Sequence, residues 1–307
     1  MFISANSRFS VSGLLALFLV GCGGGGSNTD PLAGSPSNTT KSLTLGFMAT
    51  ANQQEVSCGT TITGLGGAAT DVEFQDFRFF IHDVRLVKDS GEEVAVVLEQ
   101  NQWQHSNVAL IDFQNKADKC GGADKAIHDY ITASYLDDGS NYTGVRFHVG
   151  LPATLNHNNP AQAASPLNVT SLQWNWQAGY KFMRIDVAPV GGITRASDPE
   201  YVATAWNFHL GSTGCSGDPV KGEIVSCVRP NRPEVSLSGL TLGVSEVVVD
   251  YGVLIEENIL AMDAAGAPGC MSGATDPECT SIFARLGLDT STGESISSTA
   301  QSVFRIE

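Results

Sequence analysis

Basic residues are scarce in this chain of 307 residues, in which 17 lysines and arginines stand against 32 aspartates and glutamates. The formal net charge is −15 at pH 7, and no run of basic residues occurs. Nucleic acids and anionic membrane surfaces attract proteins through clustered positive charge, so we expect neither as a partner. The acidic balance helps to keep a protein soluble, and it indicates no particular substrate.

Motifs that carry catalysis are also missing. The sequence contains no GxSxG nucleophile elbow, no HExxH zinc motif, no GxxxxGK phosphate loop and no calcium-binding loop around residues 137–139. Residues 63–67 are rich in glycine, but they lack the strand and helix that flank a dinucleotide site. We therefore predict that the protein is not an enzyme.

Helical periodicity is equally scarce and is confined to residues 258–264 and 281–286. Alternation of apolar and polar residues dominates instead, which is typical of half-buried strands, and turn-like links at residues 88–92 and 177–179 predict hairpins. Strands are predicted at residues 42–48, 76–87, 93–98, 144–150, 171–177, 180–187, 203–210, 234–242 and 246–253. The predicted fold class is therefore all-β, a single β-sandwich-like domain with long loops.

No apolar run is long enough to span a bilayer as a helix, which takes about 20 residues. The run at residues 14–20 follows the single cationic residue Arg8 and has the length of a signal-peptide core. It ends in Gly21-Cys22, which resembles a bacterial lipobox, where the cysteine thiol takes a lipid. Residues 1–21 are therefore predicted to be a lipoprotein signal peptide. An ordinary secretory signal with an incidental cysteine is the alternative.

The segment after the predicted lipid attachment site is rich in glycine and serine. Residues 22–40 are predicted to be a flexible tether, and residues 41–307 a folded β domain of a size that one core can support. We expect the protein in the cell envelope, held to a membrane by the lipid on Cys22. Gly23 follows that cysteine in place of an acidic residue. By a sorting convention this favours the outer membrane, facing the periplasm or the cell surface.

Six further cysteines follow Cys22, namely Cys58, Cys120, Cys215, Cys227, Cys270 and Cys279. An even number in an oxidising compartment predicts structural disulfides, and no CxxC spacing supports a zinc or thioredoxin-like site. Many connectivities are possible. Proximity in the sequence favours Cys215 with Cys227 and Cys270 with Cys279, which leaves Cys58 with Cys120.

Two tryptophans, Trp174 and Trp176, stand two residues apart just before the turn at residues 177–179. In a strand both side chains point to the same face. Taken alone, they are most simply interpreted as core or groove-lining aromatics on a hairpin.

Longer motifs around these tryptophans resemble those of the MbnP family, the four-Cys proteins of metallo-mystery pair systems, along nearly the whole mature chain. The matching segments are Phe77-Arg78-Phe79, Asp83-Val84-Arg85-Leu86, residues 108–113, Gly150-Leu151-Pro152, Leu155-Asn156-His157, Trp174-Asn175-Trp176, residues 209–215 with the sequence HLGSTGC, and residues 270–273 with the sequence CMSG. Several uncommon motifs in one order make the resemblance specific.

The resemblance implies a copper-binding protein that works beside a di-haem, peroxidase-like partner of the MbnH type. It implies that the partner oxidises Trp174 to kynurenine, that Trp176 stays intact beside the site, and that one Cu(I) ion binds near a histidine and a methionine. An indole N–H is only a donor and offers a metal no lone pair. Opening the ring creates an aromatic amine and a ketone. Imidazole and thioether are donors that suit the soft Cu(I) ion.

The resemblance leaves the copper ligands open. His209 and His157 lie in matching segments and are the candidate histidines, whereas the other four histidines look structural. Met271 of the CMSG segment is the first candidate thioether, and Met183 on the strand after the tryptophans is the second. Family members often carry a methionine where this chain has Leu172. Trp103-Gln104-His105 is a rival Trp-x-His arrangement.

An alternative of a different class is a non-enzymatic β-sandwich adhesin or polymer-binding lipoprotein, in which the paired tryptophans form an aromatic platform. Copper content and a mass change at Trp174 distinguish it from a copper protein.

Overall fold

The computed structural model describes residues 38–116, 120–121, 125–175, 177–218, 221, 223 and 225–307. The predicted signal peptide, the lipidation site Cys22, most of the predicted tether and the second tryptophan, Trp176, lie outside these residues. Residues Asn38–Glu307 belong to one folded unit. Among the described residues, no helix has the length and apolar character needed to cross a membrane.

The first sheet has six strands and is built around β1 (Thr39–Ala51). Leu43, Leu45, Phe47 and Ala49 alternate with more exposed residues in β1, so one face of the strand is apolar. β20 (Glu246–Asp250) pairs with β1 in parallel, and β9 (Tyr130–Asp137) pairs with it on the other side in antiparallel orientation. The sheet is completed by β22 (Phe304–Ile306), β6 (Val97–Leu98) and β2 (Gln54–Glu55).

The second sheet has ten strands and is built around the long β4 (Thr70–Lys88). Its main order is β19 (Glu234–Ser238), β10 (Tyr142–Val149), β4, β13 (Met183–Pro189), β16 (Trp206–Leu210) and β21 (Gly269–Cys270). Beside this path lie β3 (Thr61–Leu65), β5 (Glu93–Ala95), β7 (Gln104–His105) and β8 (Val108–Asp112). β16 and β21 pair in parallel, at the edge of the sheet where the candidate site lies.

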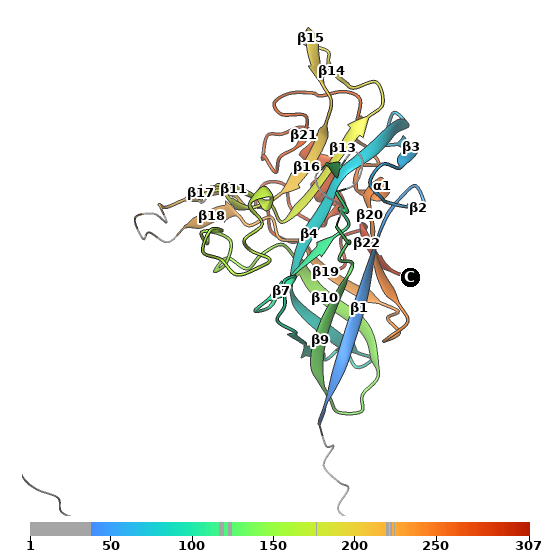
Figure 1. Cartoon of the computed structure of the whole chain (residues 1–307), viewed down its shortest axis with the longest axis vertical. Coiled ribbons are helices and arrows are strands. Elements are labelled where there is room, and N and C mark those ends of the chain that lie inside the picture. Colours follow the sequence, from blue (N-terminus) through green and yellow to red (C-terminus); the bar gives the residue numbers. More distant parts are fainter. Residues whose placement is uncertain are drawn as a thin grey trace, which may run out of the picture. The chain divides into compact units, whose positions relative to one another are not determined.

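Figure 1 shows β1 and β4, the strands around which the two sheets are built. Aromatic side chains join these sheets in the core. The ring of Phe47 on β1 lies 6.0 Å from that of Phe79 on β4 and 6.1 Å from that of Phe147 on β10. Phe304 on β22 reaches the same two rings, at 5.9 and 5.6 Å. These edge-on contacts bury large apolar surfaces. The prediction of an all-β, sandwich-like fold is confirmed.

Three small hairpins lie outside the two main sheets. They are β11 (Gln173–Asn175) with β12 (Gly179–Tyr180), β14 (Ile193–Arg195) with β15 (Asp198–Ala203), and β17 (Thr213–Ser216) with β18 (Ser226–Arg229). The hairpin predicted around residues 177–179 is thus confirmed. A short 3-10 helix, Thr170–Leu172, leads into β11.

The helices differ from the prediction in one place. Helix α2 (Cys279–Arg285) confirms the one predicted at residues 281–286. The helix predicted at residues 258–264 is wrong. A helix forms earlier instead, as α1 (Tyr251–Leu254). At its start the Asp250 side chain accepts a hydrogen bond from the Val253 N–H at 3.2 Å. In the predicted segment Met262 instead bridges to Thr194.

All three predicted disulfides form. Cys58 joins Cys120, Cys215 joins Cys227 and Cys270 joins Cys279.

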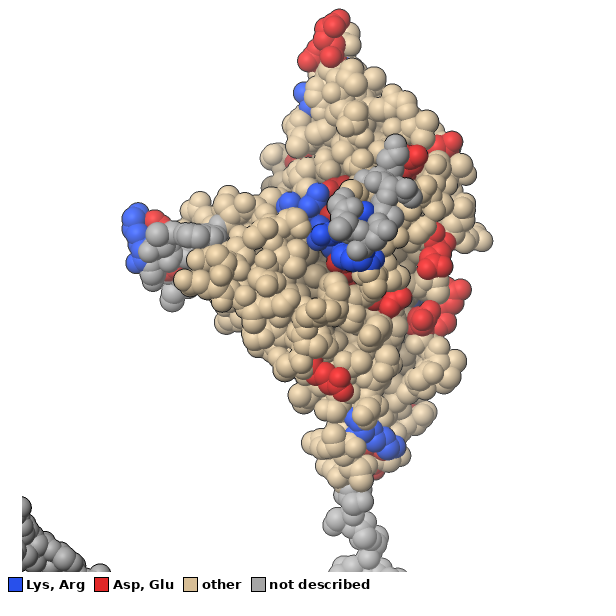
Figure 2. All heavy atoms as spheres, viewed as in Figure 1, with Lys and Arg blue, Asp and Glu red and all other residues tan. Residues whose placement is uncertain are grey.

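Acidic side chains are scattered over the face in Figure 2, and basic ones gather there in a few small groups.

Candidate metal centre

Trp174 and Met271 line one cavity. Trp174 is half-buried on β11, which pairs with β12 through Gln173 and Tyr180. The cavity has a volume of about 450 Å³. Its other lining residues are Asn175, Gln177, Ala178, Ser212, Thr213, Gly214 and Cys215. The structure therefore brings together the β11–β12 hairpin, the segment after His209 and the CMSG segment, which are far apart in the sequence.

Gly211 provides the place for the Trp174 ring. A side-chain carbon at this position would lie 2.5 Å from Cζ3 of Trp174 and 2.7 Å from the carbonyl oxygen of Tyr180. Atoms cannot approach this closely, so glycine is required for the ring to lie against this backbone. The indole therefore lies against the backbone of Gly211, which is two residues after His209 in the sequence.

His209 lies on the face of β16 that is turned away from the core. Trp206, Phe208 and Leu210 alternate with it and are fully buried. In the parallel pair of β16 with β21, Phe208 lies opposite Cys270, which is also fully buried. Met271 follows Cys270 directly, as His209 follows Phe208, so the two segments run side by side at this point.

Ser272 fastens these two segments together. Its hydroxyl donates to the carbonyl oxygen of His209 at 2.8 Å and accepts from the N–H of Gly211 at 3.1 Å. The carboxylate of Asp276 accepts from the Met271 N–H at 3.0 Å. Met271 is therefore held by its backbone, next to the strand that carries His209.

One ring nitrogen of His209 is engaged by a carboxylate. Nε2 of His209 lies 2.7 Å from Oδ1 of Asp186 on the neighbouring strand β13, and both side chains are buried. Burial alone would raise the pKa of Asp186, but the hydrogen bond and charge of His209, with the charge of Arg184, outweigh it and lower that pKa. While this bond persists, only Nδ1 of His209 can coordinate a metal. A carboxylate on the second nitrogen is a common way to fix the tautomer of a metal-binding histidine.

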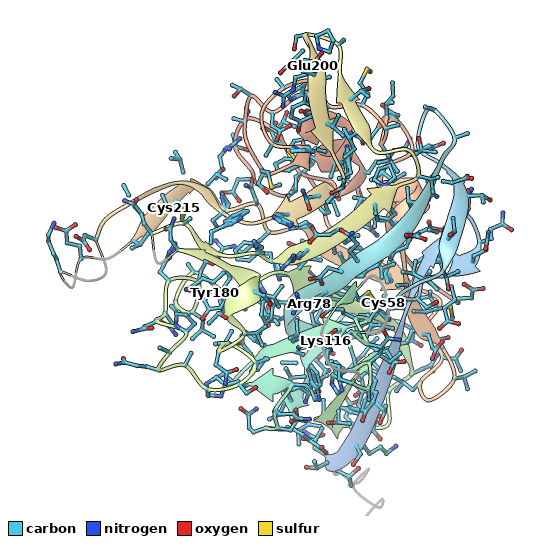
Figure 3. All side chains as sticks on the ribbon, turned by 45° about the horizontal axis from the view of Figure 1, so that its top comes forward. Cys58, Arg78, Lys116, Tyr180, Glu200 and Cys215 are labelled. Carbon is cyan, nitrogen blue, oxygen red and sulfur yellow. A yellow bond between two sulfur atoms is a disulfide. The ribbon has the colours of Figure 1, made fainter. Side chains whose placement is uncertain are left out.

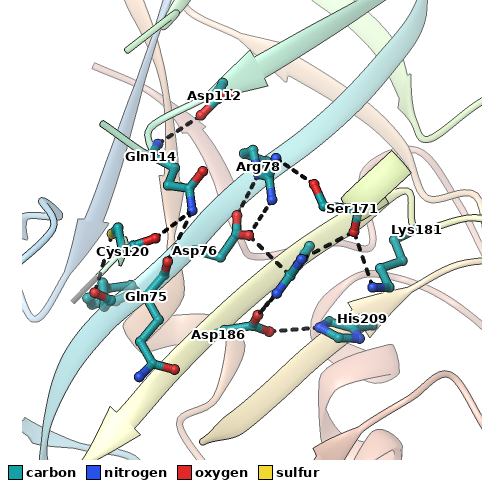
Figure 4. A network of polar contacts seen from close by, with 12 residues as sticks. Gln75, Asp76, Arg78, Asp112, Gln114, Cys120, Ser171, Lys181, Asp186 and His209 are labelled. Atoms are coloured by element: carbon teal, nitrogen blue, oxygen red, sulfur yellow. Dashed lines mark hydrogen bonds and ion pairs between the residues drawn. The ribbon is translucent and has the colours of Figure 1, made fainter. Parts of the chain in front are cut away.

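Asp186 belongs to a buried ionic network on this face of the second sheet (Figure 4). Nε of Arg184 donates to Oδ2 of Asp186 at 2.7 Å and lies 3.1 Å from Oδ2 of Asp76. Asp76 in turn accepts from Nε of Arg78 at 2.6 Å and pairs with its Nη2. Asp76 and Arg78 are almost completely buried, so each charge depends on its partners.

The same network contacts the segment just before Trp174. The guanidinium of Arg184 and the ammonium of Lys181 both donate to the carbonyl oxygen of Ser171 at 3.2 Å. Arg78 donates to the Ser171 hydroxyl, also at 3.2 Å. Ser171 stands three residues before Trp174. Arg184 therefore contacts both Asp186, the partner of His209, and the segment that leads to Trp174.

His157 lies elsewhere, beside the Cys215–Cys227 disulfide. Its Nε2 is 3.4 Å from Sγ of Cys227 and 3.1 Å from Nδ2 of Asn156. The ligand atoms of His157, Cys215 and Cys227 lie within 4.8 Å of one another. The same is true of Cys270, Asp276 and Cys279. All four cysteines are disulfide-bonded, and a disulfide sulfur is not the thiolate that binds metals.

The remaining candidate residues lie away from the cavity. Met183 is fully buried in the core, opposite Leu210 and Phe79 on the adjacent strands. Leu172 is also fully buried in the core. Trp103, the tryptophan of the rival arrangement, stacks on His128 with ring centroids 4.6 Å apart.

Sequence reasoning missed Asp186, Arg184, Asp76 and Gly211. One signal was present: Asp76 and Arg78, like Arg184 and Asp186, are opposite charges two residues apart in otherwise apolar strands. Such spacing puts each pair on one face, and buried charges need partners. The pattern could therefore have indicated a paired network, although not its contact with His209.

The donors present fit a soft monovalent ion. Nδ1 of His209 and the thioether of Met271 are the candidate donors, and both suit Cu(I). The buried carboxylates of Asp76 and Asp186 are already engaged by arginines and by His209. A hard, oxygen-seeking cation therefore finds no free carboxylate among these network residues.

Comparison with known proteins supports the resemblance that the sequence motifs indicate. The profile of the MbnP family matches residues 40–272. Among solved structures, MbnP from Methylosinus trichosporium is similar with a TM-score of 0.81 and 29% sequence identity, over 87% of this chain and 98% of that one. The comparison with curated proteins gives no match.

Proposed function

Because the chain belongs to the MbnP family, we propose that it is an exported copper-binding protein in which oxidation of Trp174 to kynurenine completes a site for one Cu(I) ion. The observation that carries this proposal is the cavity lined by both Trp174 and Met271. The backbone before Met271 pairs with the strand that carries His209. His209 through Nδ1 and Met271 through its sulfur are the proposed ligands. The protein is the substrate of its oxidising partner and has no catalytic role of its own.

The intact indole cannot serve as a ligand, because its nitrogen has no lone pair to give. Ring opening inserts two oxygen atoms, and hydrolysis then releases formate, so the residue gains one oxygen and loses one carbon. The product carries an aromatic amine and a ketone at the cavity wall. Two molecules of hydrogen peroxide would supply the two oxygen atoms and leave as water. A di-haem, peroxidase-like partner of the MbnH type, the class of partner implied by the family, would catalyse this oxidation.

Replacing Trp174 by phenylalanine tests this function. Phenylalanine has no indole to open, and it still fills much of the space against Gly211, so the variant should fold but retain no copper after co-expression with the di-haem partner. Trp103→Phe is the matched control, because that tryptophan stacks on His128 and is outside the cavity. If Trp103→Phe lost copper and Trp174→Phe loaded fully, the copper site would instead be the rival arrangement of Trp103 and His105.

Asp186→Asn should weaken copper binding by about tenfold to a hundredfold, the usual effect of losing a histidine's outer partner in a metal site. An amide can turn its NH2 group toward Nε2 of His209, which would favour the tautomer with the proton on Nδ1. Nitrogen-15 NMR of the histidine rings would show this change of tautomer, and Cu(I) competition titration would give the affinity. An unchanged tautomer with unchanged affinity would show that Asp186 does not orient His209.

Anchoring through Cys22 is part of the proposal and has its own test. Cys22→Ala should move the protein from the membrane fraction to the soluble exported fraction, because the thiol that would take the lipid is gone. Retention in membranes at the wild-type level would count against a lipid anchor.

A further inference from the structure

The Cys215–Cys227 disulfide lies in a setting that would keep its two sulfurs together after reduction. The two cysteines are directly opposite each other in the β17–β18 hairpin, with Cα atoms 3.8 Å apart. Pairing of Thr213 with Arg229 and of Ser216 with Ser226 continues on either side. Figure 3 shows Cys215 on this hairpin, well apart from Cys58. Backbone pairing, and not only the covalent bond, therefore holds the two side chains close.

The disulfide is also accessible. Cys215 and Cys227 are both half-exposed, whereas Cys270 and Cys279 have exposures of 0% and 2%. Thiol–disulfide exchange requires a thiolate to reach a sulfur atom. A reductant under native conditions should therefore open Cys215–Cys227 before it opens Cys270–Cys279.

His157 brings an unprotonated ring nitrogen close to this disulfide. The backbone N–H of Tyr180 donates to Oδ1 of Asn156 at 3.0 Å, which fixes the orientation of the Asn156 amide. The amide nitrogen, Nδ2, therefore faces Nε2 of His157 at 3.1 Å and can only donate to it. Nε2 must then be the unprotonated nitrogen of the ring, and it lies 3.4 Å from Sγ of Cys227.

We propose that Cys215, Cys227 and His157 form a second metal site, for a soft cation, once a dithiol has reduced the disulfide. One thiolate of the dithiol attacks a sulfur and its second thiol displaces the other, so the protein gains two electrons and two protons and the dithiol becomes a disulfide. Binding the metal then releases both protons from the cysteine thiols. Nε2 of His157 exchanges its hydrogen bond from Asn156 for the metal.

Two thiolates and one imidazole form a donor set for Zn²⁺, Cd²⁺ or Cu(I), with solvent able to occupy a fourth position. The three ligand atoms already lie within 4.8 Å of one another, so little rearrangement is needed. Cys215 also lines the cavity that holds Trp174 and Met271. This site goes beyond the proposed function, because none of its ligands depends on oxidation of Trp174.

The test uses the full mature chain expressed without a di-haem partner and titrated with Cd²⁺ as the probe. After mild dithiol reduction, the wild type should bind one Cd²⁺ with a thiolate-to-cadmium absorption band, and the oxidised protein should show none. Alkylation with peptide mapping should identify Cys215 and Cys227 as the opened pair. His157→Ala should weaken binding by at least about tenfold, since even an outer-shell partner is worth that much.

Two matched double variants distinguish this site from the other cysteines. Cys215→Ser with Cys227→Ser should abolish the band, and Cys58→Ser with Cys120→Ser should keep it. The small hairpin lies outside both main sheets, so circular dichroism should show that the first variant keeps its fold. A band that survives the first pair of changes, undiminished binding by His157→Ala, or opening of another disulfide first would each overturn the proposal.

Discussion

His209→Ala is expected to lose copper while Trp174 in the same sample is still oxidised. The imidazole is one of two proposed ligands, so its removal should lower Cu(I) affinity by more than about a hundredfold, beyond the usual effect of losing an outer partner. The Trp174 ring lies against Gly211 and borders a cavity that His209 does not line, so oxidation does not require the imidazole. Copper per chain and the mass of the Trp174 peptide, measured on one preparation, separate the two effects.

The matched control is His157→Ala in the oxidised protein. His157 borders the Cys215–Cys227 disulfide and is not one of the two proposed copper ligands, so copper loading of this variant should equal that of the wild type. If His209→Ala loaded fully and His157→Ala did not, the ligand would be His157.

Asp76→Asn is expected to destabilise the fold by about 3–5 kcal/mol, the typical effect of breaking a buried ion pair. Asp76 is 2% exposed and lies between the guanidinium groups of Arg78 and Arg184. A neutral amide leaves the buried Arg78 and the half-buried Arg184 with too little negative charge nearby. Urea unfolding at neutral pH would measure the loss.

Asp83→Asn on the same strand is a matched control. Asp83 and Arg85 have the same Asp-x-Arg spacing as Asp76 and Arg78, but their side chains are 36% and 37% exposed. An exposed pair contributes less than about 1 kcal/mol. The backbone φ of 52° at Asp83 is one that asparagine also adopts. Equal losses in the two variants would show that burial does not decide the strength of these pairs.

Much of the fold could be predicted from local pattern. Alternation in residues 42–48 and 76–87 marks β1 and β4, because one face of each strand is buried in the sandwich core. The predicted strand at residues 93–98 shows the limit of this signal. Its two halves, β5 and β6, pair in different sheets. Alternation shows which face is buried, but it does not specify the neighbouring strand.

The candidate site could be located from its motifs, which favoured His209 over His157 and Met271 over Met183. The contacts of these residues could not be predicted in the same way. The parallel pairing of β16 with β21 brings Cys270, the residue before Met271, opposite Phe208, the residue before His209, whereas Met183 is buried in the core. Such long-range pairing depends on the whole fold, and no local periodicity reports it.

The contact between Asp186 and His209 was equally inaccessible to sequence reasoning. The two residues lie on neighbouring strands, diagonal to each other, since Arg184 is the register partner of His209.

The aromatic-platform alternative depends on tryptophan rings that are open to solvent. It also concerns Trp176, which lies outside the described residues. Trp174 is instead half-buried against Gly211, at the wall of a cavity.

Copper per chain in the wild type, with the Trp174 peptide weighed in the same sample, tests the central proposal most directly. The protein is expressed with and without an MbnH-type di-haem partner. With the partner, the peptide should gain one oxygen and lose one carbon, and the chain should hold close to one equivalent of copper. Without the partner, neither change should occur. Full copper loading of a chain whose Trp174 is unmodified would contradict the proposed function.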